Sequence, residues 1–245
     1  MNNKLLNNTV LMVTGCIVLV IICYYYVDKP VADFFFRYHS ANKPVAEFFF
    51  GNQALGKSEN WLSFIVRWSV LIEYLPPFIA IFFIIKHNVS QYLSKNEKIF
   101  MVIALNMTLA TSIKNILKFV FGRYWPKTWM GGNPSWLQSH QYGFHFFHSG
   151  SAYNSFPSGH ATAIFAMMTI VWMVYPKWRW LCVISCLGMA ISLIVLNYHF
   201  VSDVIAGMFL GIITGQNATY YFLRSEKNRI FCDKIIATNN KLPKR

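Results

Sequence analysis

The clearest pattern in the chain is a series of long apolar runs separated by short polar segments. A bilayer core about 30 Å thick is crossed by ~20 apolar residues in a helix, and runs close to that length recur along the chain. The expected membrane spans are residues 10–27, 61–85, 99–121, 158–175, 180–196 and 202–222. The pattern therefore predicts an all-α helical bundle with six transmembrane helices. Residues 1–245 form one polytopic membrane domain, which ends in a basic tail at residues 223–245.

Composition supports a membrane protein and disfavours other classes. Charged residues make up 13% of the chain and hydrophobic ones 55%. Soluble domains carry about 25% charged residues, so this chain does not fit a disordered segment or most soluble enzymes. The net charge of +13 is typical of some nucleic-acid binders. Those proteins gather their basic residues on one patch, whereas here these residues lie between apolar runs. We therefore expect a membrane lipid partner and no nucleic acid.

The positions of the basic residues predict the orientation in the membrane. Cytoplasmic loops carry an excess of Lys and Arg. Such residues are concentrated in two short loops and the tail, including Lys86, Lys95, Lys98, Lys177 and Arg179. Both termini are therefore expected in the cytoplasm, and the longer loops at residues 28–60 and 122–156 outside. The first run is interpreted as a retained anchor, because tyrosines follow it where a signal peptide has a small-residue cleavage site.

The first outer loop contains an internal repeat. The string KPVADFFF at residues 29–36 recurs as KPVAEFFF at residues 43–50. One interpretation is an interfacial helix anchored by aromatic side chains. The other is a rim that guides a lipid toward a site.

Ionisable residues inside the spans are the first candidates for function, because they are costly in a bilayer. Arg67 and Glu73 fit a structural pair. Lys114 and Lys118 are four residues apart, on one helical face near the outer surface, where they would attract an anion. Asp203 opens the last span.

Three polar strings at span ends carry further chemistry. They are KFVFGRYWP at residues 118–126, SFPSGH at residues 155–160, and SLIVLNYHFVSD at residues 192–203. The second string opens a span, and a helix N-terminus binds phosphate through its unpaired N–H groups and its dipole.

Individual residues of these strings suit phosphate chemistry. Ser158 can cap the helix, Gly159 permits close approach, and His160 lies over the bound group. His199 and Asp203 are four apart. The carboxylate can then accept from one imidazole nitrogen while the other attacks.

The three strings resemble the signature of the type 2 phosphatidic acid phosphatase superfamily, written K-x6-R-P, P-S-G-H and S-R-x5-H-x3-D. Members have a six-helix core, and the membrane branch acts on lipid phosphates without a metal. The resemblance implies that His199 is the nucleophile and that Asp203 orients it. It further implies that His160 is the general acid and base. Lys118, Ser158 and Gly159 would bind the phosphate.

Two positions depart from this pattern. Trp125 and Leu193 stand where the family has arginines. Arg123 matches a second arginine that many members carry, in a G-R-x-R-P segment. We expect Arg123 to bind the phosphate in place of the missing residues.

The resulting prediction is an integral lipid phosphatase of the inner (plasma) membrane, with its site facing the periplasm or exterior. It would hydrolyse a lipid phosphate monoester or pyrophosphate through a phosphohistidine, with no cofactor or metal. Candidate substrates are lipid A, phosphatidylglycerophosphate, phosphatidate and polyprenyl pyrophosphate.

Four alternatives remain open from the sequence. The same histidine chemistry would serve a lipid-to-lipid phosphotransferase, and a catalytically weak relative would only bind lipid phosphate. A small transporter would show paired broken spans, but only Pro76-Pro77 interrupts one. A metal at His145 and His148 would need further ligands, and no carboxylate or cysteine follows at ligand spacing.

Overall fold

A computed structural model describes residues 3–41, 74–131 and 135–239. Its regular elements within these ranges are helical, so the expected all-α fold is confirmed. The long helices are α1 (Asn3–Ile22), α2 (Asp28–Ala41), α5 (Pro76–Ser90), α6 (Lys95–Phe121), α8 (Gly159–Val174), α9 (Arg179–Val195) and α10 (Val201–Asn239). The short ones are the π-helical turn η1 (Cys23–Val27), the 3-10 turns η3 (Pro126–Gly131), η4 (Ser151–Tyr153) and η5 (Pro176–Trp178), and α7 (Trp136–Ser139).

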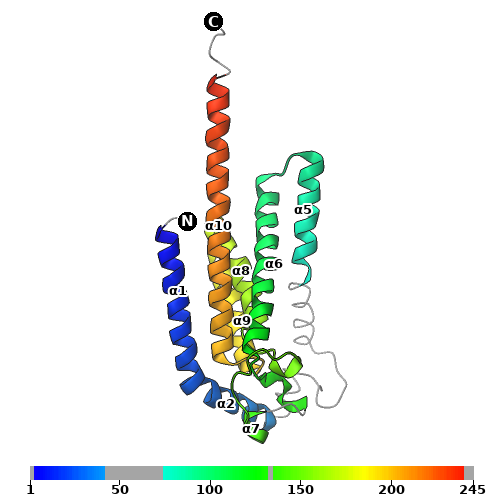
Figure 1. Cartoon of the computed structure of the whole chain (residues 1–245), viewed down its shortest axis with the longest axis vertical. Coiled ribbons are helices and arrows are strands. Elements are labelled where there is room, and N and C mark those ends of the chain that lie inside the picture. Colours follow the sequence, from blue (N-terminus) through cyan, green and yellow to red (C-terminus); the bar gives the residue numbers. More distant parts are fainter. Residues whose placement is uncertain (1–2, 42–73, 132–134, 240–245) are drawn as a thin grey trace.

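The long helices run alongside one another and form a bundle around α10. Figure 1 shows α1, α6 and α10 with their axes roughly parallel and α10 running opposite to the other two, with α2 and α7 across one end. Helix α10 packs against α8, α6 and α1, while α5 packs against α6 and α9 against α8. The C-terminal end of α6 and the N-terminal ends of α8 and α10 therefore meet near α2.

Three helical stretches among the described residues are long and apolar enough to cross a membrane. They are Leu5–Tyr38, Lys95–Phe121 and Pro176–Val195, and Gly159–Val174 is a shorter apolar helix. Large apolar side chains on the outer faces of these helices are exposed in the isolated chain, as a lipid-facing surface requires. Examples are Leu11 on α1 and Ile184 on α9.

Several helix boundaries differ from the runs read from the sequence. The first apolar run is part of a continuous helix from Asn3 to Ala41, which includes the first copy of the repeat. Helix α5 begins at Pro76, where a proline costs no hydrogen bond. The last run lies within α10, which continues to Asn239. The second copy of the repeat, Arg67 and Glu73 lie outside the described residues.

A stripe of glycines on α10 allows this helix to approach the backbone of α8. A Cβ added at Gly207 would lie 2.5 Å from the carbonyl oxygen of Ser158. One added at Gly211 would lie 2.6 Å from both the N of Ala166 and the carbonyl oxygen of Thr162. Small residues at four-residue spacing permit such close helix contacts in membranes. The stripe thereby sets the position of the α8 N-terminus against α10.

We predict that Gly211→Ala destabilises the protein, because the added methyl group meets backbone atoms that cannot rotate away. Overpacking of this kind costs about 1–3 kcal/mol. The control is Gly188→Ala on α9, where no atom lies within 4 Å of the added Cβ. Thermal unfolding in detergent should show a lower midpoint for Gly211→Ala and an equal or higher one for Gly188→Ala. Equal midpoints for Gly211→Ala and the wild type would contradict the prediction.

Candidate active site

The end of α6 places Lys118 beside the ring of Trp125. Gly122 closes α6 in the left-handed conformation, with φ +48°, and donates its N–H to the carbonyl of Lys118. A Cβ there would lie 1.9 Å from the carbonyl oxygen of His145, so the turn requires glycine. The Lys118 ammonium lies 5.4 Å from the centre of the Trp125 ring and donates to the carbonyl of Asn154.

The start of α8 carries Ser158, Gly159 and His160. Ser158 is the N-cap residue, and its side chain accepts a hydrogen bond from the N–H of Ala161. The backbone N–H of Ser158 donates to the carbonyl of Asp203 at 3.0 Å, which joins the start of α8 to α10. The first N–H groups of a helix have no partner within it and carry the positive end of its dipole. This helix start therefore has the properties of an anion site.

His199 lies in the turn between α9 and α10, and Asp203 lies in the first turn of α10. The distance between Nδ1 of His199 and Oδ2 of Asp203 is 3.6 Å. The same oxygen accepts hydrogen bonds from the N–H of Phe200 at 3.0 Å and from the hydroxyl of Ser155. Both His199 and Asp203 are buried. A fixed carboxylate beside Nδ1 favours the tautomer that leaves Nε2 as the nucleophile.

The rings of Trp125 and Tyr198 connect the three motifs. The Trp125 ring lies 5.6 Å from the ring of His199, and its Nε1 donates to the carbonyl of Tyr198 at 2.7 Å. The Tyr198 ring lies 5.5 Å from the ring of His160. His199, His160 and Lys118 are thus gathered around the same two rings. The tryptophan in place of the family arginine is in the centre of this group.

Arg123 lies inside the protein, whereas the sequence predicts it at the substrate phosphate. Its side chain is 0% exposed. Nη1 donates to Oδ1 of Asp203 at 2.6 Å and to the hydroxyl of Ser202. Nη2 donates to Oδ2 of Asp28 at 2.7 Å and to the hydroxyl of Tyr142 at 2.8 Å. A buried guanidinium needs such partners, and these carboxylates occupy the two terminal nitrogens that would otherwise reach a phosphate.

Arg123 and Tyr142 keep fixed protonation states in this cluster. Burial opposes the charge on Arg123, but Asp203 and Asp28 outweigh it and raise the pKa of the guanidinium above its ordinary value. For the Tyr142 hydroxyl, burial raises the pKa, so this group stays protonated and can donate a hydrogen bond. The cluster therefore contains one cation between two carboxylates.

Several residues of this cluster were not predicted from the sequence. Asp28 is assigned there to an outer loop, but in the structure it is 0% exposed and bonded to Arg123. Ser155 and Ser202 each bond a carboxylate of the cluster. Only their positions in the sequence could have indicated these residues, because each is a polar residue at the end of an expected span. Lys114 is buried in α6, one turn before Lys118.

His145 and His148 lie in an aromatic cluster of the outer loop. The His145 ring is 4.4 Å from the ring of Tyr124, and the His148 ring is 5.4 Å from the ring of Tyr153. Over the described ranges, no three His, Cys, Asp or Glu side chains are grouped as metal ligands. The structure thus gives these histidines packing partners.

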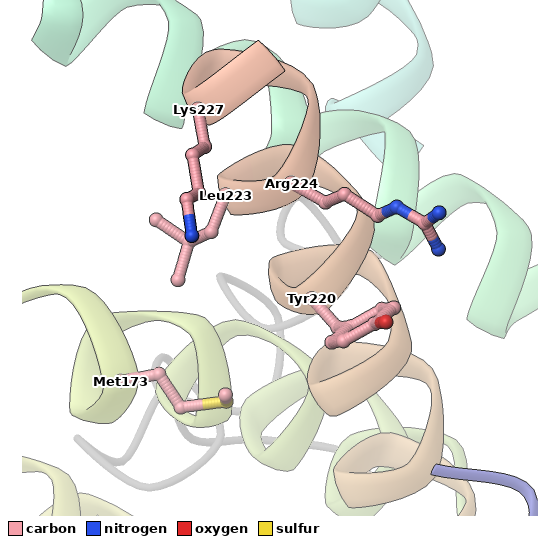
Figure 2. Close-up of a pocket in the computed structure, with 5 residues that line it drawn as sticks. All are labelled: Met173, Tyr220, Leu223, Arg224 and Lys227. Atoms are coloured by element: carbon pink, nitrogen blue, oxygen red, sulfur yellow. The ribbon is translucent and has the colours of Figure 1, made fainter. Parts of the chain in front are cut away.

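A surface hollow of about 480 Å³ lies at the end of the bundle opposite the histidine site. Figure 2 shows that Met173 of α8 and four side chains of α10 line it, namely Tyr220, Leu223, Arg224 and Lys227. At 1.5 Å per residue, this hollow is about 30 Å along α10 from Asp203. None of its lining side chains is a histidine or carboxylate, so it is separate from the histidine site.

Comparison with known proteins identifies the family. The model of the PAP2 superfamily matches residues 99–227, just over half of the chain. The chain belongs to the PAP2 superfamily. The PAP2 match contains every motif residue from Lys118 to Asp203 and leaves Asp28 outside. The resemblance predicted from the three strings is confirmed.

Two bacterial relatives are similar to part of this PAP2 chain. The lipid A 1-phosphatase of Rhizobium johnstonii is 31% identical over 102 residues, which are 40% of this chain and 38% of that protein. The lipid A 1-phosphatase of Rhizobium etli is 30% identical over 102 residues, 40% of each protein. The alignments thus span about two fifths of these relatives.

One solved structure is also similar. It is the crystal structure of a transmembrane PAP2 type phosphatidylglycerolphosphate phosphatase from Bacillus subtilis. It has a TM-score of 0.43 and 16% identity, and the match covers 88% of this chain and 96% of that one.

We predict that Arg123→Ala strongly destabilises this PAP2 protein, because it leaves two buried carboxylates without their cation. Breaking a buried pair from one side costs about 3–5 kcal/mol. The control is Arg37→Ala, which removes an exposed pair with Asp33 and should cost about 1 kcal/mol or less. Arg123→Lys should recover only part of the stability that Arg123→Ala loses, since an ammonium cannot present a planar fork to two carboxylates. Unfolding in detergent measures all three, and equal losses for the two alanine variants would disprove the structural role.

Proposed function

We propose that this chain is a membrane lipid phosphatase that hydrolyses a lipid phosphate monoester through a phosphohistidine at His199. The observation that carries the proposal is the pairing of His199 with Asp203 beside His160 and the start of α8, in a chain of the PAP2 superfamily. The two lipid A 1-phosphatases support a lipid phosphate as the substrate class.

In the proposed first step, Nε2 of His199 attacks the phosphorus atom. A bond forms between Nε2 and phosphorus, and the bond from phosphorus to the lipid oxygen breaks. His160 donates a proton to that oxygen, so the lipid leaves as an alcohol. Asp203 faces the Nδ1 side of the imidazole and stabilises the positive charge that develops on the ring.

In the proposed second step, water attacks the phosphorus of the phosphohistidine. His160, now deprotonated, accepts a proton from that water. The bond from phosphorus to Nε2 breaks, and inorganic phosphate leaves with His199 neutral again. Transfer to a lipid hydroxyl in place of water would make the protein a phosphotransferase.

The phosphate oxygens are proposed to bind to Lys118, to Ser158 and to the N–H of Gly159. These groups come from the end of α6 and the start of α8, which meet next to His199. Because the terminal nitrogens of Arg123 are bonded to carboxylates, the charge of the transition state falls mainly on Lys118 and the helix N-terminus. A histidine nucleophile with these groups needs no metal for the displacement, so we propose metal-independent hydrolysis.

The site is proposed to face the periplasm or exterior of an inner membrane, with both termini in the cytoplasm. Basic residues support this orientation, because Lys86, Lys98 and Lys227 lie toward the end of the bundle opposite the histidines. Two of them form ion pairs there, Lys86 with Glu97 and Lys98 with Glu226. Figure 1 shows the turn between α5 and α6 at this end, far from α2 and α7.

We predict that His199→Ala abolishes phosphate release, with a loss of more than about a thousandfold, since the nucleophile is gone. The control is His148→Ala, a histidine of the outer loop that should retain activity. The measurement is phosphate release by the purified protein from lipid A, phosphatidylglycerophosphate, phosphatidate and a polyprenyl pyrophosphate.

The same preparation identifies the intermediate. Labelled substrate quenched within a turnover should leave acid-labile, base-stable label on the wild type and none on His199→Ala. Activity should persist in EDTA. Label on a serine or carboxylate, or a loss of activity in EDTA that Mg²⁺ restores, would be inconsistent with the mechanism.

We predict the orientation from single cysteines in a background without native ones. Ser149→Cys lies in the exposed outer loop, and Ser90→Cys lies at the exposed C-terminal end of α5. In intact cells with a permeable outer membrane, an impermeant thiol reagent should label Ser149→Cys only. A permeant reagent should label both and serves as the control. Labelling of Ser90→Cys alone would reverse the orientation.

A further inference from the structure

Asp28 lies at the junction of the first helix with α2, just after the π-helical turn η1. It is 0% exposed although it is charged and close to the membrane surface. It also lies outside residues 99–227, the part of the chain that the family model matches. Asp28 is therefore not one of the motif residues that the sequence singles out.

Each carboxylate oxygen of Asp28 has a defined partner. Oδ1 accepts a hydrogen bond from the backbone N–H of Ser202 at 2.9 Å. Oδ2 accepts from Nη2 of Arg123 at 2.7 Å and from the hydroxyl of Ser202. Since Nη1 of Arg123 donates to Asp203, one guanidinium joins the two carboxylates. Asp28 thus bonds both to Arg123 and to the first turn of α10. That turn also carries Asp203, which faces His199.

The π-helical turn places Asp28 in this position. The backbone N–H of Asp28 donates to the carbonyl of Cys23, five residues back. In an α-helix it would donate to the carbonyl of Tyr24. That carbonyl instead accepts from the hydroxyl of Tyr142 at 2.9 Å, and the same hydroxyl accepts from Arg123. An extra residue in a helical turn of this kind is frequent at functional sites.

The charges in the cluster do not balance when His199 is neutral. With both carboxylates ionised, Asp28 and Asp203 carry two negative charges and Arg123 carries one positive charge, which leaves one negative charge beside the imidazole. When Nε2 of His199 bonds to phosphorus and Nδ1 keeps its proton, the ring becomes a cation. The excess negative charge then attracts the positive imidazole ring, which exists only during the reaction. An interaction that is stronger in the transition state than in the ground state lowers the barrier to phosphorylation.

We propose that Asp28 is a positioning residue of the phosphatase site. It fixes Arg123 and the start of α10 so that Asp203 faces His199, and it supplies the negative charge that the phosphorylated ring requires. This inference rests on the proposed function, because it concerns the rate at which His199 is phosphorylated. The N-terminal helix is by this account part of the active site.

The test is rapid-quench measurement of the phosphohistidine in Asp28→Asn. The amplitude of labelling counts the sites that are correctly folded, and the rate constant reports the chemistry at those sites. Asp28→Asn keeps the size of the side chain and removes its charge. We expect an unchanged amplitude and a rate constant lower by about one to two orders of magnitude, as a small displacement of catalytic groups produces.

The matched control is Asp33→Asn on the same helix, where the carboxylate pairs with Arg37 at the surface. Both its amplitude and its rate constant should equal those of the wild type. Ser202→Ala is a second test that leaves the charges in place. It removes the hydroxyl that bonds both Asp28 and Arg123, and it should also lower the rate constant. If Asp28→Asn does not fold, Ser202→Ala decides the question.

The outcomes separate this inference from the proposed function. A wild-type rate constant in Asp28→Asn, or in Ser202→Ala where only that variant folds, overturns the positioning role. A lower amplitude with an unchanged rate constant in Asp28→Asn also overturns it, because that result shows a purely structural role. If the wild type itself forms no phosphohistidine, the proposed function fails, and this inference fails with it.

Discussion

The charge on Arg123 has to be balanced inside the protein, and the geometry of the site follows from this requirement. A guanidinium with no exposure to water is tolerable only when carboxylates neutralise it. Its partners, Asp28 and Asp203, are 95 and 80 residues away in the chain. The loop after α6, the first helix and the start of α10 are therefore joined at one point. His199 lies four residues before Asp203, and the Asp203 carboxylate faces its Nδ1 atom at 3.6 Å.

Trp125 alters the electrostatics of the proposed phosphate site. An arginine donates to two oxygens through a planar fork, whereas an indole offers one N–H, and here that N–H is bonded to the carbonyl of Tyr198. The Lys118 ammonium lies 5.4 Å and the His199 ring 5.6 Å from the centre of the Trp125 ring. Its face attracts the ammonium and keeps it at the site. In the proposed site, one arginine fewer is thus combined with a lysine that contacts the Trp125 ring and the carbonyl of Asn154.

The sequence was sufficient for those features that depend on short spacings. The apolar runs predict helices, and the separation of His199 from Asp203 predicts their contact, because residues four apart share a helical face. Arg123 shows the limit of this reasoning. Spacing indicates that it lies near the site but does not reveal whether its partner is a phosphate or a carboxylate. That depends on Asp28, whose inward direction depends on a single π-helical turn that no local pattern indicates.

The glycine stripe of α10 has a consequence for how this site can diversify. Where Gly207 and Gly211 meet α8, the nearest atoms are main-chain atoms, which are the same whatever the side chain. Substitutions on α8 therefore cannot change the separation of the two helices at these points. The start of α8 is thereby held close to Asp203, while α2 beyond Asp28 and the parts of the outer loop away from Arg123 are free to vary. Under the proposed function, new substrates would be accommodated by changing the surroundings of a reaction centre whose helix contact stays the same.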